Sequence, residues 1–199
     1  MTIIDRFSVV MPADNIPGTR QGQWTYKDYA ALPDNGQRYE IVNGVLLMAP
    51  APSGSHQKAA GKIFYYLLTY VEFAGWGQVF QAPFDVELLP DMVVQPDVLV
   101  LLNTGLDKYV ESRIIGAPDL VVEVVSPGTA AYDRLSKYDA YAHAGVPEYW
   151  IANPLKRTVE VLVLKNGRYN SLGVFEGSNS LPSKIVPGIS VVRVEQFFS

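Results

Sequence analysis

The fold of this chain is decided by two stretches, Gln95-Pro96-Asp97-Val98-Leu99-Val100-Leu101-Leu102 and Asp119-Leu120-Val121-Val122-Glu123-Val124-Val125-Ser126. Both are near-continuous aliphatic runs rich in valine, as expected for strands that are covered on both faces. Each run carries an acid, Asp97 or Glu123, and burial of a carboxylate is costly unless a partner compensates it. If the two strands are neighbours, these carboxylates can meet across about 5 Å of sheet. The residues leave two interpretations open, a divalent-metal site or two strand-end carboxylates in water.

The segments around these strands predict an α/β fold, a mixed sheet with at least two helices packed on it. Three helices are expected. They span residues 26–32, a long segment from a cap at Ser53 or Ser55 to about Phe73, and residues 130–144. Asn43-Gly44 and Asn166-Gly167 each separate two strand-like runs and predict β-hairpins, because both turn residues must accept positive φ. Residues 78–88 predict one further strand. We expect an irregular N-terminal arm over residues 1–23 and a single domain over residues 24–199.

The composition excludes several classes of site. There are 199 residues, of which 48% are hydrophobic and 18% charged, which is typical of a globular domain. The absence of cysteine excludes disulfides, thiolate zinc sites and cysteine nucleophiles, and it is consistent with a reducing cytoplasm. No signal peptide and no membrane-spanning run are expected, so the predicted location is cytoplasmic.

The net charge of −4 argues against strong non-specific binding of nucleic acid, which depends on neutralising phosphates. A basic cleft can nevertheless lie on an acidic protein. The candidate basic residues for such a cleft are Lys58, Lys62, Arg134, Lys137, Lys156 and Arg157.

Three further residues have two interpretations each. Lys137 follows Asp133 at i,i+4 on one helical face, which Tyr141 continues, and this spacing favours a surface ion pair of little energetic value. The helix begins soon after Glu123, so its first turns could instead lie above the ends of the two strands. His56, a lone histidine after a Pro/Ser/Gly loop, is either a ligand or a cap or surface residue, and the second is its default interpretation. Glu40, in the first hairpin strand, is either an exposed position or a third acid at the site.

Taken in order, several motifs resemble the Uma2 family (formerly DUF820), restriction endonuclease-like proteins of the PD-(D/E)XK nuclease superfamily. The matching segments cover most of residues 25–165 and are Tyr39-Glu40-Ile41-Val42-Asn43-Gly44, Met48-Ala49-Pro50, His56, Gln95-Pro96-Asp97-Val98, Ala117 to Pro127, Asp133, Lys137, Tyr141, Ala144 to Ile151 and Asn153-Pro154. The resemblance implies a restriction endonuclease-like core, with a central mixed sheet flanked by helices, plus extra hairpins.

The resemblance also implies which residues form the site. Asp97 and Glu123 would be the metal-binding acids, and Glu40 an additional acid. The superfamily places a lysine two residues after the second acid, where this chain has Val125. The family is expected to have moved that lysine to the following helix, at Lys137.

The leading hypothesis is therefore Mg²⁺-dependent (or Mn²⁺-dependent) hydrolysis of phosphodiester bonds in DNA. Asp97, Glu123 and the backbone carbonyl of Val124 would hold the metal, and Lys137 would orient the attacking water or stabilise charge on the phosphate. The residues expected to support this site are Asp133, Tyr141 and His56.

Two alternatives come from other functional classes. One is a catalytically silent binding or assembly module on the same fold, which the acidic net charge and the displaced lysine motivate. The other is a metal-dependent hydrolase of small phosphate esters. A homodimer is also expected from the resemblance, with the aromatic residues Tyr149, Trp150 and Phe197 as its interface.

Overall fold

The structure, a computed structural model, describes residues 10–126 and 136–199. Within these residues the α-helices are α1 (Tyr26–Ala30), α2 (Gly54–Leu67) and α4 (Tyr138–Ala144), and a π-helical turn (Leu68–Glu72) continues α2. Three 3-10 helices span Asn103–Lys108, Pro187–Val191 and Val194–Phe198. The strands are β1 (Met11–Pro12), β2 (Arg38–Val42), β3 (Val45–Ala49), β4 (Gly77–Gln81), β5 (Asp85–Leu89), β6 (Met92–Val94), β7 (Val98–Leu102), β8 (Tyr109–Val110), β9 (Arg113–Ile115), β10 (Leu120–Val124), β11 (Glu148–Asn153), β12 (Thr158–Lys165) and β13 (Arg168–Glu176).

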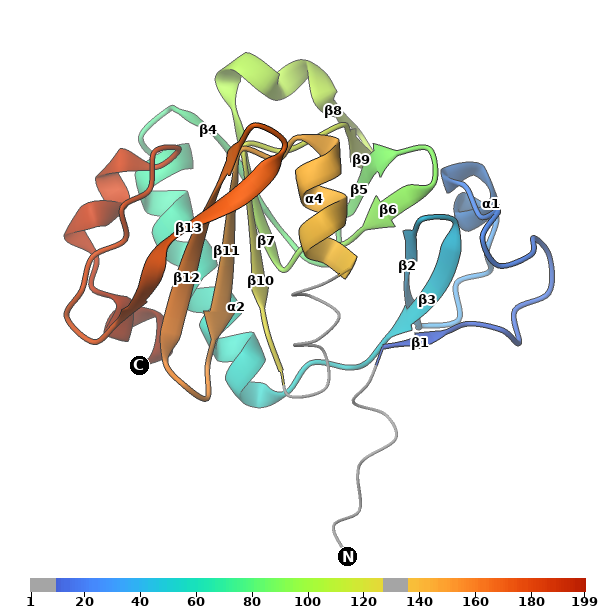
Figure 1. Ribbon diagram of the computed structural model, residues 1–199, viewed down its shortest axis with the longest axis horizontal. Coiled ribbons are helices and arrows are strands. Elements are labelled where there is room, and N and C mark those ends of the chain that lie inside the picture. The colour runs from blue at the N-terminus through green and yellow to red at the C-terminus, as the bar shows by residue number, and fades with distance from the viewer. Residues whose placement is uncertain (1–9, 127–135) are drawn as a thin grey trace, which may run out of the picture.

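The mixed α/β character is confirmed, but the strands form two mixed sheets where one was expected (Figure 1). The first has seven strands in the order β1-β3-β2-β6-β5-β9-β8, and the second has six in the order β13-β12-β11-β10-β7-β4. Each sheet contains one parallel pair, β5 with β9 and β10 with β11. The remaining neighbours are antiparallel.

The chain passes between the two sheets at two prolines. The expected strand 78–88 breaks at Pro83, so β4 joins the six-stranded sheet and β5 the seven-stranded sheet. Pro96 then separates β6, a strand that was not predicted, from β7, and these two strands again lie in different sheets. Proline cannot donate a ladder hydrogen bond, and it allows the chain to leave one sheet for the other.

The six-stranded sheet is covered on both faces (Figure 1). Alternate residues such as Val98, Val122 and Trp150 face α2 and the C-terminal 3-10 helices. The intervening residues, such as Leu99 and Val121, face α4 and the seven-stranded sheet. This double cover explains the continuous aliphatic runs of the two central strands.

Both predicted hairpins are confirmed. β2 and β3 are joined by Asn43 and Gly44, with φ of 52° and 71°, and β12 and β13 by Asn166 and Gly167, with φ of 54° and 74°. The long helix is confirmed as well, since the Ser53 side chain accepts a hydrogen bond from the third residue of α2.

Three other expectations need correction or lie outside the described residues. The N-terminal arm is not wholly irregular, because Met11–Pro12 pairs with β3. The expected helix at 130–144 is described only from residue 136, so Asp133 and Arg134 lie outside the described residues. The proposed dimer interface is wrong, because Tyr149, Trp150 and Phe197 are fully buried in the core of this chain.

Among the described residues, no helix has the length and apolar character that crossing a membrane requires.

Candidate functional site

Glu123 lies in the middle of β10, on the face of the sheet that α4 covers. Only 4% of the residue is exposed. Its Oε1 accepts hydrogen bonds from the Lys137 Nζ at 2.8 Å and from the Tyr141 hydroxyl at 2.6 Å. Lys137 and Tyr141 are one helical turn apart, so both reach the same carboxylate. The described part of the helical segment, from Lys137 to Tyr141, therefore lies above the strand that carries Glu123.

Glu40 approaches the same lysine from the other sheet. Its Oε1 accepts hydrogen bonds from the Lys137 Nζ at 2.9 Å and from the Gln95 backbone N–H at 2.9 Å. The expectation of a surface ion pair is wrong for Lys137, because the residue is only 4% exposed and bridges two buried acids. Glu40 is likewise buried and is not an exposed strand position.

Asp97 directly precedes β7, the antiparallel neighbour of β10. Its Oδ2 accepts the backbone N–H of Val124 at 2.8 Å. The ladder between these strands stops at the pair of Val98 and Val122, because the chain turns away at Pro96. The Asp97 side chain therefore satisfies a backbone donor that the departing strand leaves without a ladder partner.

His56 is the second partner of Asp97, with 3.0 Å between its Nε2 and the Asp97 Oδ2. The default interpretation of His56 as a cap or surface residue is wrong, because its side chain is only 12% exposed. Within the described residues its Nδ1 is buried without a hydrogen-bond partner, so the ring is oriented through Nε2.

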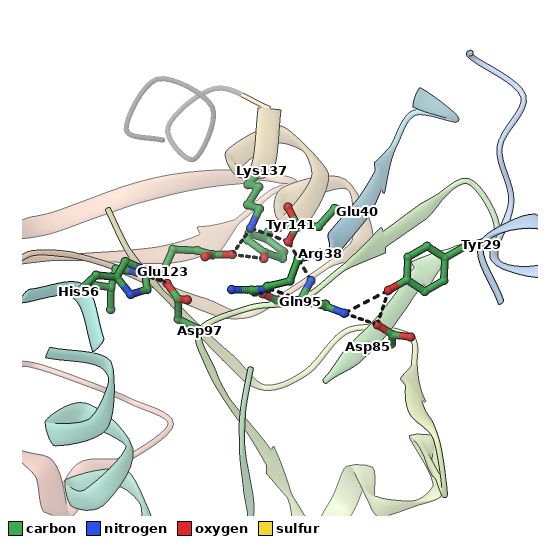
Figure 2. Close-up of polar contacts among 11 residues, drawn as sticks. Tyr29, Arg38, Glu40, His56, Asp85, Gln95, Asp97, Glu123, Lys137 and Tyr141 are labelled. Carbon is green, nitrogen blue, oxygen red and sulfur yellow. Dashed lines mark hydrogen bonds and ion pairs between the residues drawn. The ribbon is translucent and has the colours of Figure 1, made fainter. Parts of the chain in front are cut away.

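Two groups of predicted site residues thus meet at one place (Figure 2). Glu40, Lys137 and Tyr141 gather around Glu123, and His56 contacts Asp97. The groups are joined through β10, where Glu123 is followed by the Val124 that binds Asp97.

Asp119, the acid that begins the second stretch, has a separate role. Its Oδ2 accepts the backbone N–H of Leu102 at 2.8 Å, at the opposite end of β7 from Asp97. It therefore caps the end of β7.

The buried ionisable side chains that the structure describes at this site are the acids Glu40, Asp97 and Glu123 and the base Lys137. Burial raises the pKa of Tyr141 well above its usual value, and the negative charges of Glu123 and Glu40 raise it further. Tyr141 is therefore a neutral donor at physiological pH.

The donor set is compatible with Mg²⁺ but provides no complete cage. No group of three or more His, Asp or Glu side chains in residues 10–126 and 136–199 is arranged to hold a metal ion. Mg²⁺ usually keeps several waters and takes only one or two carboxylates from the protein, together with substrate phosphate. Asp97 and Glu123 can supply these carboxylates. The Val124 carbonyl projects on the same side of β10 as its N–H, towards Asp97, and can supply a third oxygen.

Arg38 and Gln95, which were not predicted as site residues, also lie beside this site (Figure 2). A small cleft of about 140 Å³ is lined by Arg38, His56, Gln57, Gln81 and Asp97 among others. The signal for Arg38 was available, because it lies two residues before Glu40 and strand alternation places both on one face. Gln95 lies in the motif Gln95-Pro96-Asp97-Val98, but the motif alone assigned it no role.

Comparisons with known proteins show the family of the chain and its fold. The sequence model of the Uma2 family, described as "Putative restriction endonuclease", matches residues 26–195. No curated protein shows significant sequence similarity. The fold is similar to a crystal structure of "a putative nuclease belonging to DUF820" from Anabaena variabilis ATCC 29413. That match has a TM-score of 0.71 and 18% identity, and it covers 88% of this chain and 97% of that chain. At this identity it supports the fold only.

Proposed function

The chain belongs to the Uma2 family, and we propose that it is a Mg²⁺-dependent (or Mn²⁺-dependent) endonuclease that hydrolyses phosphodiester bonds of DNA. One observation carries the proposal. The amine of Lys137 lies between two buried acids, Glu40 and Glu123, and the strand that bears Glu123 also binds Asp97. A fixed ammonium beside paired carboxylates is the combination that metal-assisted phosphate hydrolysis requires.

Asp97, Glu123 and the Val124 carbonyl would hold the metal. When bound, it would lower the pKa of a coordinated water and polarise the scissile phosphate. Lys137 would orient that water or stabilise negative charge on the phosphate. Glu40 and Tyr141 act as positioning residues, because Glu40 binds the Lys137 amine and Tyr141 binds the Glu123 carboxylate. Glu40, the additional acid, thus supports the lysine.

The test is cleavage of supercoiled plasmid DNA with Mg²⁺ or Mn²⁺. Asp97→Asn, Glu123→Gln and Lys137→Met are each expected to reduce the cleavage rate by a factor of at least about 10² to 10³. Glu195→Gln, an exposed acid near the C-terminus, is the control and should cleave as the wild type does. Circular dichroism verifies that each variant is folded. Equal cleavage by the wild type and the three site variants would contradict the assignment.

The same ion pairs also favour a second candidate, a binding or assembly module without catalysis. Lys137 already contacts one oxygen of each acid, as a purely structural bridge would. Calorimetric titration with Mg²⁺ and Mn²⁺ distinguishes the two candidates. Metal binding that Asp97→Asn removes favours the nuclease, whereas a folded wild type that binds no metal favours the silent module. Comparing plasmid DNA with small phosphodiesters as substrates separates the nuclease from a small-ester hydrolase.

A further inference from the structure

Arg38 shares a strand with a residue of the proposed site. It begins β2, and Glu40 follows two residues later on the same strand face. While Glu40 reaches Lys137, Arg38 lines the cleft that also contains Asp97 and His56. The strand therefore places a guanidinium beside the candidate metal ligands.

Neutral groups hold this guanidinium in place. Its Nε donates to the Gln95 Oε1 at 3.1 Å, and its Nη2 donates to the Gln95 backbone carbonyl at 3.3 Å. In the part of the chain that the structure describes, Arg38 has no carboxylate partner and its Nη1 makes no hydrogen bond. Arg113 is different, since its Nε pairs with the Glu87 carboxylate at 2.7 Å. The charge of Arg38 is therefore oriented but not neutralised, which suits recognition of an anion.

Gln95 is itself fixed from three sides (Figure 2). Its backbone N–H donates to Glu40, and its side-chain amide donates to the Asp85 Oδ1 at 2.9 Å and to the Tyr29 hydroxyl oxygen at 3.1 Å. These bonds use the donors of the amide and leave its carbonyl oxygen to accept from Arg38. Gln95 is thus a positioning residue for the guanidinium.

The size of the cleft limits its ligand. Its volume of about 140 Å³ is below the usual range of small-molecule pockets. A cleft of this size can accommodate one phosphate group. Because Asp97 also lines the cleft, a phosphate there needs a cation to offset the repulsion.

We propose that the Arg38 guanidinium binds a non-bridging phosphate oxygen of a nucleic-acid backbone, and that Gln95 holds it in position beside Asp97. The inference rests on the proposed function, since the nuclease supplies the reason for a phosphodiester at this site. Recognition here is of the backbone and carries no base specificity.

The first experiment measures DNA affinity by fluorescence anisotropy at several salt concentrations, with Ca²⁺ present and with a duplex labelled at one end. Arg38→Met is expected to weaken binding by about tenfold or more. The slope of log affinity against log salt should fall by about 0.9, as for the loss of one phosphate contact on B-DNA. Arg38→Lys should keep the slope but lose part of the affinity, because lysine retains the positive charge but lacks the planar set of guanidinium donors. Arg193→Met, which changes an exposed arginine, is the control.

The second experiment uses dimethyl phosphate as the probe and follows the Arg38 Nε–H resonance by NMR in the wild-type protein. The resonance should shift on titration, and Gln95→Glu should abolish the shift by giving Arg38 an intramolecular carboxylate partner.

The two experiments separate failure of the inference from failure of the proposed function. An unchanged salt slope in Arg38→Met together with an unmoved resonance would overturn the inference, even if Asp97→Asn still abolished cleavage. Arg38-dependent binding by a wild type that does not cleave DNA would support the phosphate contact and refute the nuclease.

Discussion

Glu123 and Glu148 are buried on adjacent parallel strands of one sheet, yet their surroundings differ. Glu123 faces α4 and is held by a charged amine and a phenol, both from that helical segment. Glu148 faces the opposite side and accepts the Trp150 Nε1–H at 2.7 Å and the Lys184 backbone N–H at 2.9 Å. Within the described residues no cationic side chain contacts Glu148. Burial of a carboxylate is therefore no mark of a functional site, whereas the nature of its partners is.

Glu123 and Glu148 also differ in the groups that surround their hydrogen-bond partners. The Lys137 amine connects Glu123 to Glu40, and the backbone next to Glu123 binds Asp97 at the edge of a cleft. Glu148 has only neutral, fixed donors and lies against the core formed by α2 and the C-terminal segment. One acid is part of a charged network that reaches a cleft, and the other satisfies local donors.

The largest expected effect is the loss of stability when the lysine beside Glu123 is replaced, compared with replacement of the lysine beside Glu148. Lys137→Met removes the ammonium that bridges the buried acids Glu40 and Glu123, so the free energy of unfolding should fall by about 3–5 kcal/mol. Lys184→Met is the matched control, because the exposed Lys184 contributes only its backbone N–H to Glu148. Urea denaturation measures both. If Lys137→Met changed the free energy of unfolding by less than about 0.5 kcal/mol, the claim that Glu123 depends on a charged partner and Glu148 does not would be wrong.

A smaller loss is expected when Glu148 becomes an amide. Glu148→Gln places an NH₂ group opposite one of two N–H donors, so a buried donor is left unsatisfied. The free energy of unfolding should fall by about 1–3 kcal/mol. Trp150→Phe, which removes one of these donors, provides an independent estimate of the same bond. If neither substitution changed the urea midpoint, the proposed structural role of Glu148 would be wrong.

The central strands β7 and β10 were predictable from the sequence, but the division into two sheets and the long-range partners of the buried acids were not. Continuous aliphatic runs identified β7 and β10, which are neighbours as anticipated, with Glu123 on β10 and Asp97 directly before β7. A break at Pro83 could have been expected, but the assignment of the strands on either side of Pro83 and Pro96 to separate sheets depends on long-range pairing. The donor from Lys184 to Glu148 comes from 36 residues away, and no local pattern encodes such a contact.

Within the site, the contacts of Lys137 and Arg38 likewise depend on long-range packing that a local sequence pattern does not encode. Helical spacing placed Lys137 on the face of Tyr141, but only the packing of α4 on β10 brings both to Glu123. Alternation along β2 could have linked Arg38 with Glu40, whereas Gln95 acquires its role through contacts with Asp85 and Tyr29 on other elements.

The smallest expected effect is a pH dependence of stability that arises from Tyr141, the phenol that donates to Glu123. Its folded pKa is raised, mainly by burial and also by Glu123, so folded Tyr141 keeps its proton after the unfolded chain has lost it. The contribution to stability is complete below about pH 10 and falls by about 1.4 kcal/mol per pH unit above it. The stability advantage of the wild type over Tyr141→Phe should therefore shrink as pH rises from about 9 to about 11.

Tyr65→Phe, which changes a tyrosine that is 58% exposed, is the control for this measurement and should show no such convergence with the wild type. Urea denaturation at each pH provides the free energies. A difference between the wild type and Tyr141→Phe that stays constant over this range would contradict the raised pKa.

Mg²⁺-dependent cleavage of plasmid DNA by Glu123→Gln and Glu148→Gln, each shown to be folded, tests the central distinction most directly. Glu148→Gln is expected to cleave at the wild-type rate at a temperature where it remains folded, whereas Glu123→Gln should be inactive. Wild-type cleavage by Glu123→Gln, or equal loss of cleavage in both folded variants, would contradict the assignment of the site to the α4 face of the sheet.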